Sequence, residues 1–292
     1  MDSSNEIKTV VFPVAGLGSR FLPVTKIVAK ELLPILNKPL IEYAVSEAIK
    51  AGIEKFIFVT SPGKQSITDY FRTNKILEDE LIDKNSEYLE LLSNDIILED
   101  NLIEVIQDKP LGLGHAIWCA KDYISGPFAV ILPDDLVVSE VPCIKQMIDI
   151  YKKNKSNIVA VQEVDKNNIS KYGVIDFVEK DQNIYNVKDM VEKPNKEEAP
   201  SNLAIIGRYI LSPDIITELS RQEVGFGGEI QLTDAIKKSI NSDNVIGYQF
   251  DGKRFDCGSI IGSLEAQLSI AINDNKYKDD VIELINRTLC KE

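Results

Sequence analysis

Residues 8–20 read KTVVFPVAGLGSR, and this stretch decides the fold because a short β-branched strand runs directly into a glycine-rich loop. Apolar residues recur at helical spacing over residues 40–49, and a second strand is predicted over residues 56–60. A strand, a helix and a strand in this order predict a right-handed crossover between parallel strands. The sequence therefore predicts an α/β fold with a doubly wound, mostly parallel sheet. Further strands are expected at 103–107, 128–132 and 158–164, with helices at 115–123 and 141–153.

The second half of the chain is expected to extend the same sheet, because no Pro/Gly/Ser linker separates the halves. Strands are predicted at 173–177, 184–192 and 204–211, and helices are expected to dominate from Glu229 onward. A small additional antiparallel sheet is also expected. We therefore predict one domain over 1–292, in which residues 8–165 contain a charged helical insertion at 73–100, residues 166–258 close over the carboxyl edge of the sheet, and residues 259–292 form C-terminal helices.

Composition excludes several classes of protein. The chain has 292 residues and a net charge of −13, which repels polyanions, so we expect no binding to nucleic acid or to an anionic membrane. No apolar run approaches the roughly twenty residues that span a bilayer. The four cysteines form no C-x-x-C pair and no zinc-binding group, which favours reduced thiols and a cytoplasmic location. A small phosphate ester remains a plausible ligand if cations gather locally.

Such cations gather near the N-terminus. Gly16, Gly18, Ser19 and Arg20 are followed by Lys26 and then by the pair Lys30-Glu31. Closely spaced glycines let backbone N–H groups approach phosphate oxygens, while Arg and Lys neutralise their charge. A dinucleotide fingerprint would require glycine at position 21, which is Phe, and no G-x-x-x-x-G-K occurs, so neither the NAD nor the P-loop interpretation holds. The alternative is an ordinary turn with solvated charges.

Two further groups of side chains lie at predicted strand ends. Asp134 and Asp135 end an apolar strand, where carboxylates can hold a magnesium ion (Mg2+) against a triphosphate, although Asp135 could simply start a turn. Asp256 is a third carboxylate that could reach the same ion. Glu192 and Lys193 suit a sugar phosphate, because a carboxylate accepts from hydroxyl groups and an ammonium holds a phosphate. Their alternative is an exposed strand end.

His115 is the only histidine, so no mechanism that needs two histidines applies. We expect it at a helix start near the ligand. A sugar-phosphate oxygen is already anionic at neutral pH and needs no protein nucleophile. The scarcity of histidine therefore agrees with direct transfer between phosphate groups.

Several motifs follow one another along the chain. They are PVAGLGSR (13–20), TKIVAKELLPILNKPLIEY (25–43), GLGHA (112–116), ILPDD (131–135), YGVID (172–176), VEKP (191–194), SNLAIIGRYIL (201–211), GGEIQLTDAI (227–236) and FDCGS (255–259). In this order they resemble the sugar nucleotidyltransferase family, and within it the bacterial UTP-glucose-1-phosphate uridylyltransferases (UDP-glucose pyrophosphorylases). The resemblance covers nearly the whole chain and implies a Rossmann-like, glycosyltransferase-A-like fold.

The resemblance also implies roles for individual residues. Arg20 and Lys30 would contact the nucleotide phosphates, and Asp134 would bind magnesium, with Asp256 as a second metal contact. Glu192 and Lys193 would hold glucose and its phosphate. The loop residues near the nucleotide would be Ala15, Gly16, Leu17, Gly18 and Ser19, the uracil side would be Glu31, Gln107 and Gly112, and the sugar pocket would include Gly173, Asn202 and Glu229.

The implied reaction transfers UMP from UTP to α-D-glucose 1-phosphate and releases pyrophosphate. Ser19 stands where the family often has Thr, and Asp135 occupies a position that is apolar in some relatives, which leaves open which aspartate binds the metal. Two alternatives remain: a glucose-1-phosphate thymidylyltransferase that uses dTTP, and a non-catalytic regulatory paralogue. The amphipathic segment 281–289 would pack on its own domain or on another subunit, and the family implies a homodimer or homotetramer.

Overall fold

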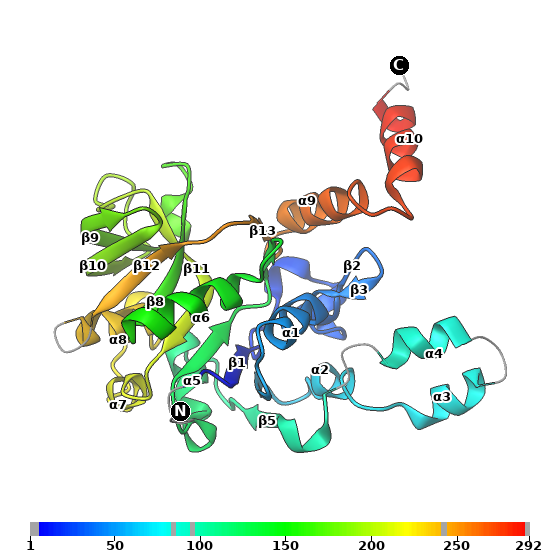
Figure 1. Ribbon diagram of the computed structural model, residues 1–292, viewed down its shortest axis with the longest axis horizontal. Helices are drawn as coiled ribbons and strands as arrows, with labels where there is room; N and C mark the ends of the chain where they lie inside the picture. The colour runs from blue at the N-terminus through cyan, green and yellow to red at the C-terminus, as the bar shows by residue number, and fades with distance from the viewer. Residues whose placement is uncertain (1–5, 83–85, 94–96, 241–243, 290–292) are drawn as a thin grey trace.

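The structure is a computed structural model that describes residues 6–82, 86–93, 97–240 and 244–289. Within these residues the main sheet has nine strands in the order β5-β4-β1-β6-β11-β8-β12-β10-β9 (Figure 1). Strands β5, β4, β1 and β6 run parallel. Their bounds are β1 Thr9–Pro13, β4 Lys55–Thr60, β5 Leu102–Ile106 and β6 Phe128–Ile131, and the other strands are β8 Asn157–Glu163, β9 Gly173–Asp181, β10 Ile184–Glu192, β11 Leu203–Leu211 and β12 Val245–Gln249.

The second half of the sheet is mixed in direction. Strand β11 pairs antiparallel with both β6 and β8, and β10 pairs antiparallel with β9 and β12. Strands β9 and β10 follow each other through a tight turn, which joins only antiparallel neighbours. The predicted α/β fold is confirmed, and the expected parallel arrangement applies to its first four strands. The expected small antiparallel pairing is also present, as β7 (Asp135–Val138) with β13 (Lys253–Asp256) and β2 (Pro34–Ile35) with β3 (Lys38–Pro39).

Helices cover both faces of the sheet because alternate residues of each strand point to opposite faces. In β1, Val10 and Phe12 join the core beneath α1 and α6, whereas Val11 joins the core beneath α5 and α8. All three side chains are fully buried. These helices are α1 Leu40–Lys50, α5 Leu113–Cys119, α6 Cys143–Asn154 and α8 Leu232–Ser239, with the shorter α2 Ser66–Asp69 and α7 Ile215–Leu219 beside them.

Helices dominate from Glu229 onward, as expected, with α8, α9 (Ile260–Ala271) and α10 (Lys278–Leu289). Two short strands that the sequence analysis did not predict, β12 and β13, intervene before α9. Strand β12 is short and contains Gly247, which weakens the usual strand pattern. A Cβ on Gly247 would lie 2.6 Å from the terminal methyl of Ile175, so any larger residue there would require that side chain to shift.

Two helices lie within residues 73–100, where the sequence predicts a helical insertion. Helices α3 (Lys75–Leu81) and α4 (Ser86–Ser93) stand away from the sheet (Figure 1). The Asn74 side chain accepts from the Leu77 N–H at 3.2 Å and caps α3. Parts of the predicted insertion at 83–85 and 94–96 lie outside the described residues. None of the described helices is long and apolar enough to cross a bilayer.

A buried ion pair joins the layers behind the carboxyl edge of the sheet. Arg208 of β11 binds Glu47 of α1 in a two-pronged contact, with Nη2 at 2.8 Å and Nε at 3.1 Å from Oε2. The same carboxylate accepts from the Ile144 N–H at the start of α6. Arg208 Nη1 also donates to the Leu132 and Gly207 carbonyls at 3.1 and 3.0 Å. The pair therefore connects two helices, one strand and the loop after β6.

Replacing Arg208 with Met should lower the free energy of unfolding by about 3–5 kcal/mol, because Glu47 would remain buried without its cation. Urea denaturation followed by circular dichroism measures this change. Lys145→Met removes the partially exposed pair with Asp149 and should cost about 0–1 kcal/mol. Equal stabilities for the two variants would contradict a structural role for the buried pair.

Candidate active site

The glycine-rich loop after β1 is held in a fixed shape by close packing. Gly18 has a φ of 66°, a left-handed conformation that favours glycine. A Cβ at this position would lie 3.1 Å from side-chain carbons of Lys30 and Thr25, and the Thr25 hydroxyl donates to the Gly18 carbonyl at 2.8 Å. Two turns of the same loop therefore pack together, and this packing brings Lys30 toward the sheet edge.

Lys64 holds the beginning of this loop from behind. Its Nζ donates to the Val14 carbonyl at 2.7 Å and to the Gly16 carbonyl at 2.6 Å. It also forms a 3.0 Å ion pair with Glu31, whose side chain is almost fully buried. The glycine loop thus rests on a buried charge pair. The sequence analysis missed Lys64, although its position just after β4 placed it at the carboxyl edge of the sheet.

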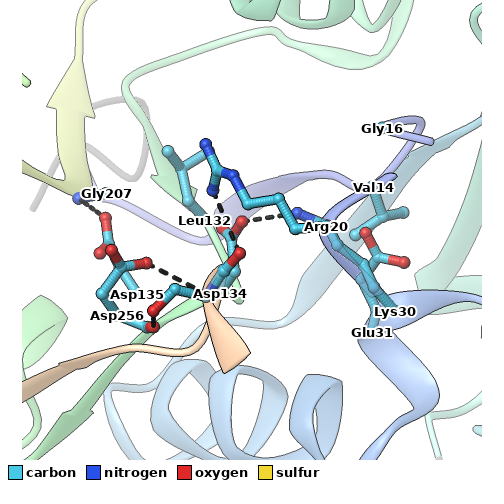
Figure 2. Close-up of polar contacts among 12 residues, drawn as sticks. Val14, Gly16, Arg20, Lys30, Glu31, Leu132, Asp134, Asp135, Gly207 and Asp256 are labelled. Carbon is cyan, nitrogen blue, oxygen red and sulfur yellow. Dashed lines mark hydrogen bonds and ion pairs between the residues drawn. The ribbon is translucent and has the colours of Figure 1, made fainter. Parts of the chain in front are cut away.

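Asp134 and Lys30 form the central ion pair of the site, with Nζ 2.5 Å from Oδ2 (Figure 2). Burial alone would raise the pKa of Asp134, but the charge and hydrogen bond of Lys30 outweigh it and lower that pKa. Burial likewise opposes the charged form of Lys30, while Asp134 and Glu31 raise the pKa of the ammonium. Both groups are therefore charged at neutral pH.

Asp135 faces a different set of partners. It accepts from Arg254 Nε at 2.6 Å and from the Gly207 N–H at 2.8 Å. Arg254 also donates to the Tyr172 hydroxyl at 3.1 Å. Figure 2 shows Asp135 directed toward Gly207, away from Lys30. Its oxygens are engaged within the protein, which leaves Asp134 as the aspartate beside the loop cations.

Asp134, Asp256 and Arg20 converge around Gly258. A Cβ on Gly258 would lie 3.1 Å from Asp134 Oδ2, 3.1 Å from Asp256 Oδ1 and 3.2 Å from Arg20 Nη1. Arg20 also donates to the Gly258 carbonyl at 3.1 Å. In the part of the chain that the structure describes, no three His, Cys, Asp or Glu residues gather into a metal site. Two carboxylates fit an ion that takes its other ligands from phosphates and water, as magnesium does.

Two cavities meet at Asp134. The smaller, of about 380 Å³, is lined by the loop after β1 and by the start of α5. The larger, of about 670 Å³, lies over β9, β10 and β13. Both include Asp134 and Glu229 in their walls. Of the predicted site residues, Ala15, Gly16, Lys30, Gln107 and Gly112 line the smaller cavity, and Arg20, Gly173, Glu192, Lys193 and Asp256 line the larger.

Glu192 and Lys193 lie at the end of β10 on the wall of the larger cavity. The Thr233 hydroxyl donates to Glu192 Oε2 at 2.7 Å and orients the carboxylate. Gly173 pairs with Glu192 across the strands, and a Cβ on this glycine would lie 3.0 Å from Oε2. Lys193 has a φ of 46°, which is uncommon for a non-glycine residue and concentrates at functional sites. The structure therefore brings this acid and base into the site.

Five predicted residues are placed outside the two cavity walls. Leu17, Ser19 and Asn202 are exposed, and Leu17 retains 72% of its accessible surface. Glu31 lies behind the loop against Lys64 rather than on the cavity wall. Gly18 shapes the loop from within. The arrangement as a whole offers two adjoining chambers with cations, carboxylates and backbone N–H groups at their junction.

Comparison with known proteins agrees with this geometry. The model of the nucleotidyl transferase family matches residues 10–272. The chain is 44% identical to the UTP–glucose-1-phosphate uridylyltransferase of Bacillus subtilis (strain 168) over 289 residues, which cover 98% of this chain and 99% of that protein. A crystal structure of UDP-glucose pyrophosphorylase complexed with UDP-glucose matches with a TM-score of 0.83 and 46% identity, over 92% of this chain and 100% of that chain. A UTP-bound UGPase from Acinetobacter baumannii matches with a TM-score of 0.87 and 38% identity, over 98% and 100% of the two chains.

Substitution of the two neighbouring aspartates should separate their roles. Asp135→Asn leaves the largely buried Arg254 without its anion and should lower the free energy of unfolding by about 3–5 kcal/mol. Asp134→Asn affects a more exposed pair and should cost no more than about 2 kcal/mol. Urea unfolding of both variants measures the difference. A larger loss for Asp134→Asn would show that the structural role belongs to Asp134.

Proposed function

We propose that this chain, which belongs to the nucleotidyl transferase family, transfers UMP from UTP to α-D-glucose 1-phosphate and releases UDP-glucose and pyrophosphate. The observation that carries this proposal is the junction of two cavities at the Lys30–Asp134 pair. Two substrates can approach each other there, beside cations that neutralise a triphosphate. The ligands bound in the solved relatives, UDP-glucose and UTP, have the chemistry that these two chambers would accept.

We assign the nucleotide to the smaller cavity. Backbone N–H groups of the loop from Ala15 through Gly16, Leu17 and Gly18 to Ser19 would approach its phosphates. Lys30 on the wall of this cavity, and Arg20 on the wall of the adjoining larger cavity, would neutralise the triphosphate. Gln107 and Gly112 would border the uracil, and Glu31 would act from behind the loop through Lys64. In this proposal residues 8–165 of a single domain form the nucleotide-binding half.

We assign the sugar phosphate to the larger cavity and residues 166–258 to its half of the domain. Lys193 would hold the phosphate, because its ammonium lies on the cavity wall. Glu192 would accept from sugar hydroxyls, since Thr233 orients its Oε2 and the Lys193 ammonium lies 3.4 Å from its Oε1. Gly173 and Glu229 would border the sugar, with Asn202 at its periphery. Galactose or glucosamine 1-phosphate differ in individual hydroxyl contacts and are the natural competitors.

In the proposed reaction, an oxygen of glucose 1-phosphate attacks the α-phosphorus of UTP in line with the bridging oxygen that leaves. A new P–O bond forms, the α–β bridge breaks, and pyrophosphate departs with the bonding electrons. The attacking oxygen is already anionic, so the chain supplies positioning and charge neutralisation rather than a base. Arg20 and Lys30 would stabilise the charge that develops on the leaving group.

Asp134 and Asp256 are the residues that would hold a divalent cation, and we propose magnesium. Their oxygens are hard ligands, and one oxygen of each lies 3.1 Å from the position of a Cβ on Gly258, which glycine leaves empty. When bound, the ion would supply charge neutralisation on the triphosphate.

A cytoplasmic location also remains a prediction.

To test this proposal, pyrophosphate release is measured in the presence of magnesium with either UTP or dTTP as the nucleotide. Each nucleotide is paired in turn with glucose, galactose and N-acetylglucosamine 1-phosphates. Pyrophosphate release should be fastest with UTP and glucose 1-phosphate and should stop when EDTA removes the cation. Asp134→Ala should lower kcat by at least about a hundredfold, while Asp122→Asn, which changes an exposed carboxylate, should not. A preference for dTTP would indicate the thymidylyltransferase, and silence with every pair would indicate the regulatory paralogue.

We also propose that the C-terminal helices mediate assembly into a homodimer or homotetramer. Figure 1 shows α9 and α10 extending away from the sheet. The side chains of Ile260, Ile261, Leu264 and Leu268 on α9 are exposed, as are those of Ile282, Leu284 and Leu289 on α10. Exposed apolar surface of this extent is typical of interaction sites.

Leu264→Glu should shift the protein toward smaller species in sedimentation velocity, because a charge would be buried in the proposed contact. Ile76→Glu provides the matched control, since Ile76 is an exposed apolar residue on the distant helix α3. The proposal fails if both variants sediment like the unsubstituted protein.

A further inference from the structure

Gln107 lies at the end of β5 on the wall of the smaller cavity, and its side chain is held by two neighbours. The residue retains only 5% of its accessible surface. Its amide nitrogen Nε2 lies 3.2 Å from the Gly112 carbonyl oxygen and 2.9 Å from His115 Nδ1. Both neighbours belong to the GLGHA segment that begins α5. Two residues of that segment therefore hold the amide nitrogen of Gln107.

The chemistry of these contacts fixes which way the amide points. A backbone carbonyl only accepts hydrogen bonds, so the amide atom beside Gly112 must be the NH₂ group and not the oxygen. The second hydrogen of that group is then directed to His115. For this contact to be favourable, Nδ1 must present a lone pair, and the ring proton must reside on Nε2. Gly112 and His115 together use both hydrogens of the Gln107 amide.

The environment of His115 keeps Nδ1 an acceptor. Partial burial lowers the pKa of the imidazole, which favours the neutral ring at physiological pH. The ring stacks near Trp118, with centroids 6.0 Å apart, and the Cys119 sulfur lies 3.8 Å from Nδ1. Neither neighbour supplies a charge that would protonate the ring. His115 itself is not on the wall of the cavity, so it acts through Gln107.

The amide oxygen of Gln107 is the part that remains for a ligand. No residue that the structure describes donates a hydrogen bond to this oxygen, although Gln107 retains only 5% of its accessible surface. Gln107 shares the wall of this cavity with the apolar residues Pro110, Leu113 and Ala116. A flat base suits this wall, and its hydrogen-bonding edge would meet a fixed acceptor.

We propose that His115 is a positioning residue that locks the Gln107 amide with its oxygen toward the cavity, so that the site accepts pyrimidines with a ring N–H and rejects cytosine. This inference rests on the proposed function and adds the origin of its base selectivity. Uracil presents N3–H as a donor to the oxygen, whereas cytosine presents an unprotonated N3. With cytosine, two acceptors would face each other in a buried place. Thymine carries the same N3–H, so this lock does not separate UTP from dTTP.

The test compares the ratio of kcat/KM for UTP to that for CTP in the unsubstituted protein, His115→Phe and His115→Asn, with glucose 1-phosphate as acceptor. Phe keeps a ring beside Trp118 but has no acceptor, so only the longer 3.2 Å contact to the Gly112 carbonyl would still hold the amide, which could then turn more easily and offer NH₂ to cytosine. His115→Phe should lower the ratio about tenfold. Asn places an acceptor oxygen at the position of Nδ1 and should restore most of the selectivity. An unchanged ratio in a folded His115→Phe protein would overturn the inference.

A second measurement does not depend on folding of a variant. His115 is the only histidine, so ¹⁵N-histidine labelling of the unsubstituted protein gives a single, unambiguous set of ring signals. At neutral pH we expect a protonated Nε2 and an unprotonated Nδ1. A proton on Nδ1 would exclude the contact to Gln107 and with it the proposed lock.

Measurements of nucleotide binding distinguish a failure of this inference from a failure of the proposed function. Trp118 is the only tryptophan and stacks on His115, so its fluorescence reports titrations with UTP and with CTP without any turnover. If no pyrophosphate is released from any substrate pair, the proposed function fails, yet a tighter binding of UTP than CTP that is lost in His115→Phe still supports the lock. Equal binding of UTP and CTP by the unsubstituted protein would overturn it.

Discussion

The Glu47–Arg208 pair is the interaction on which the site depends. An arginine and a carboxylate buried together are costly unless every donor finds an acceptor, and here the guanidinium also binds two carbonyls. One of these belongs to Leu132, two residues before Asp134. The requirement to satisfy Arg208 thus determines where the chain leaves β6. The position of the Asp134 carboxylate therefore follows from the Glu47–Arg208 pair, which does not itself contact a ligand.

The two adjacent aspartates illustrate how neighbours of identical chemistry acquire different roles. Asp135 turns to Arg254 and Gly207 and joins β7 to β13, while Asp134 turns to Lys30. Asp134 lies in the turn after β6 and Asp135 begins β7, so two adjacent acids can serve the site and the scaffold at once. Lys193, on the wall of the larger cavity, has a left-handed backbone conformation that is uncommon for a residue other than glycine. Such conformations concentrate at functional sites.

Much of this could be predicted from the sequence, because strand periodicity and the glycine loop are local signals. The alternation of Val10, Val11 and Phe12 between two cores follows directly from the pattern at residues 8–14. Strand β12 was missed because a glycine interrupts a very short run, and its place beside β8 depends on contacts distant in sequence. Lys64 and Arg254 were missed for a related reason, since each acquires its role only from the partner that folding brings to it.

The Lys30–Asp134 pair has a consequence for the solution in which the protein works. A cation that already has an anionic partner is not a general anion trap, since any incoming anion must compete with a carboxylate in contact with it. A single inorganic phosphate offers little beyond what Asp134 supplies. A chain of three phosphates can reach Arg20 and the loop N–H groups as well, and so gains enough contacts to displace the internal partner. The Lys30–Asp134 pair thus disfavours binding of the small anions that are abundant in solution, because such an anion gains too few contacts to displace Asp134.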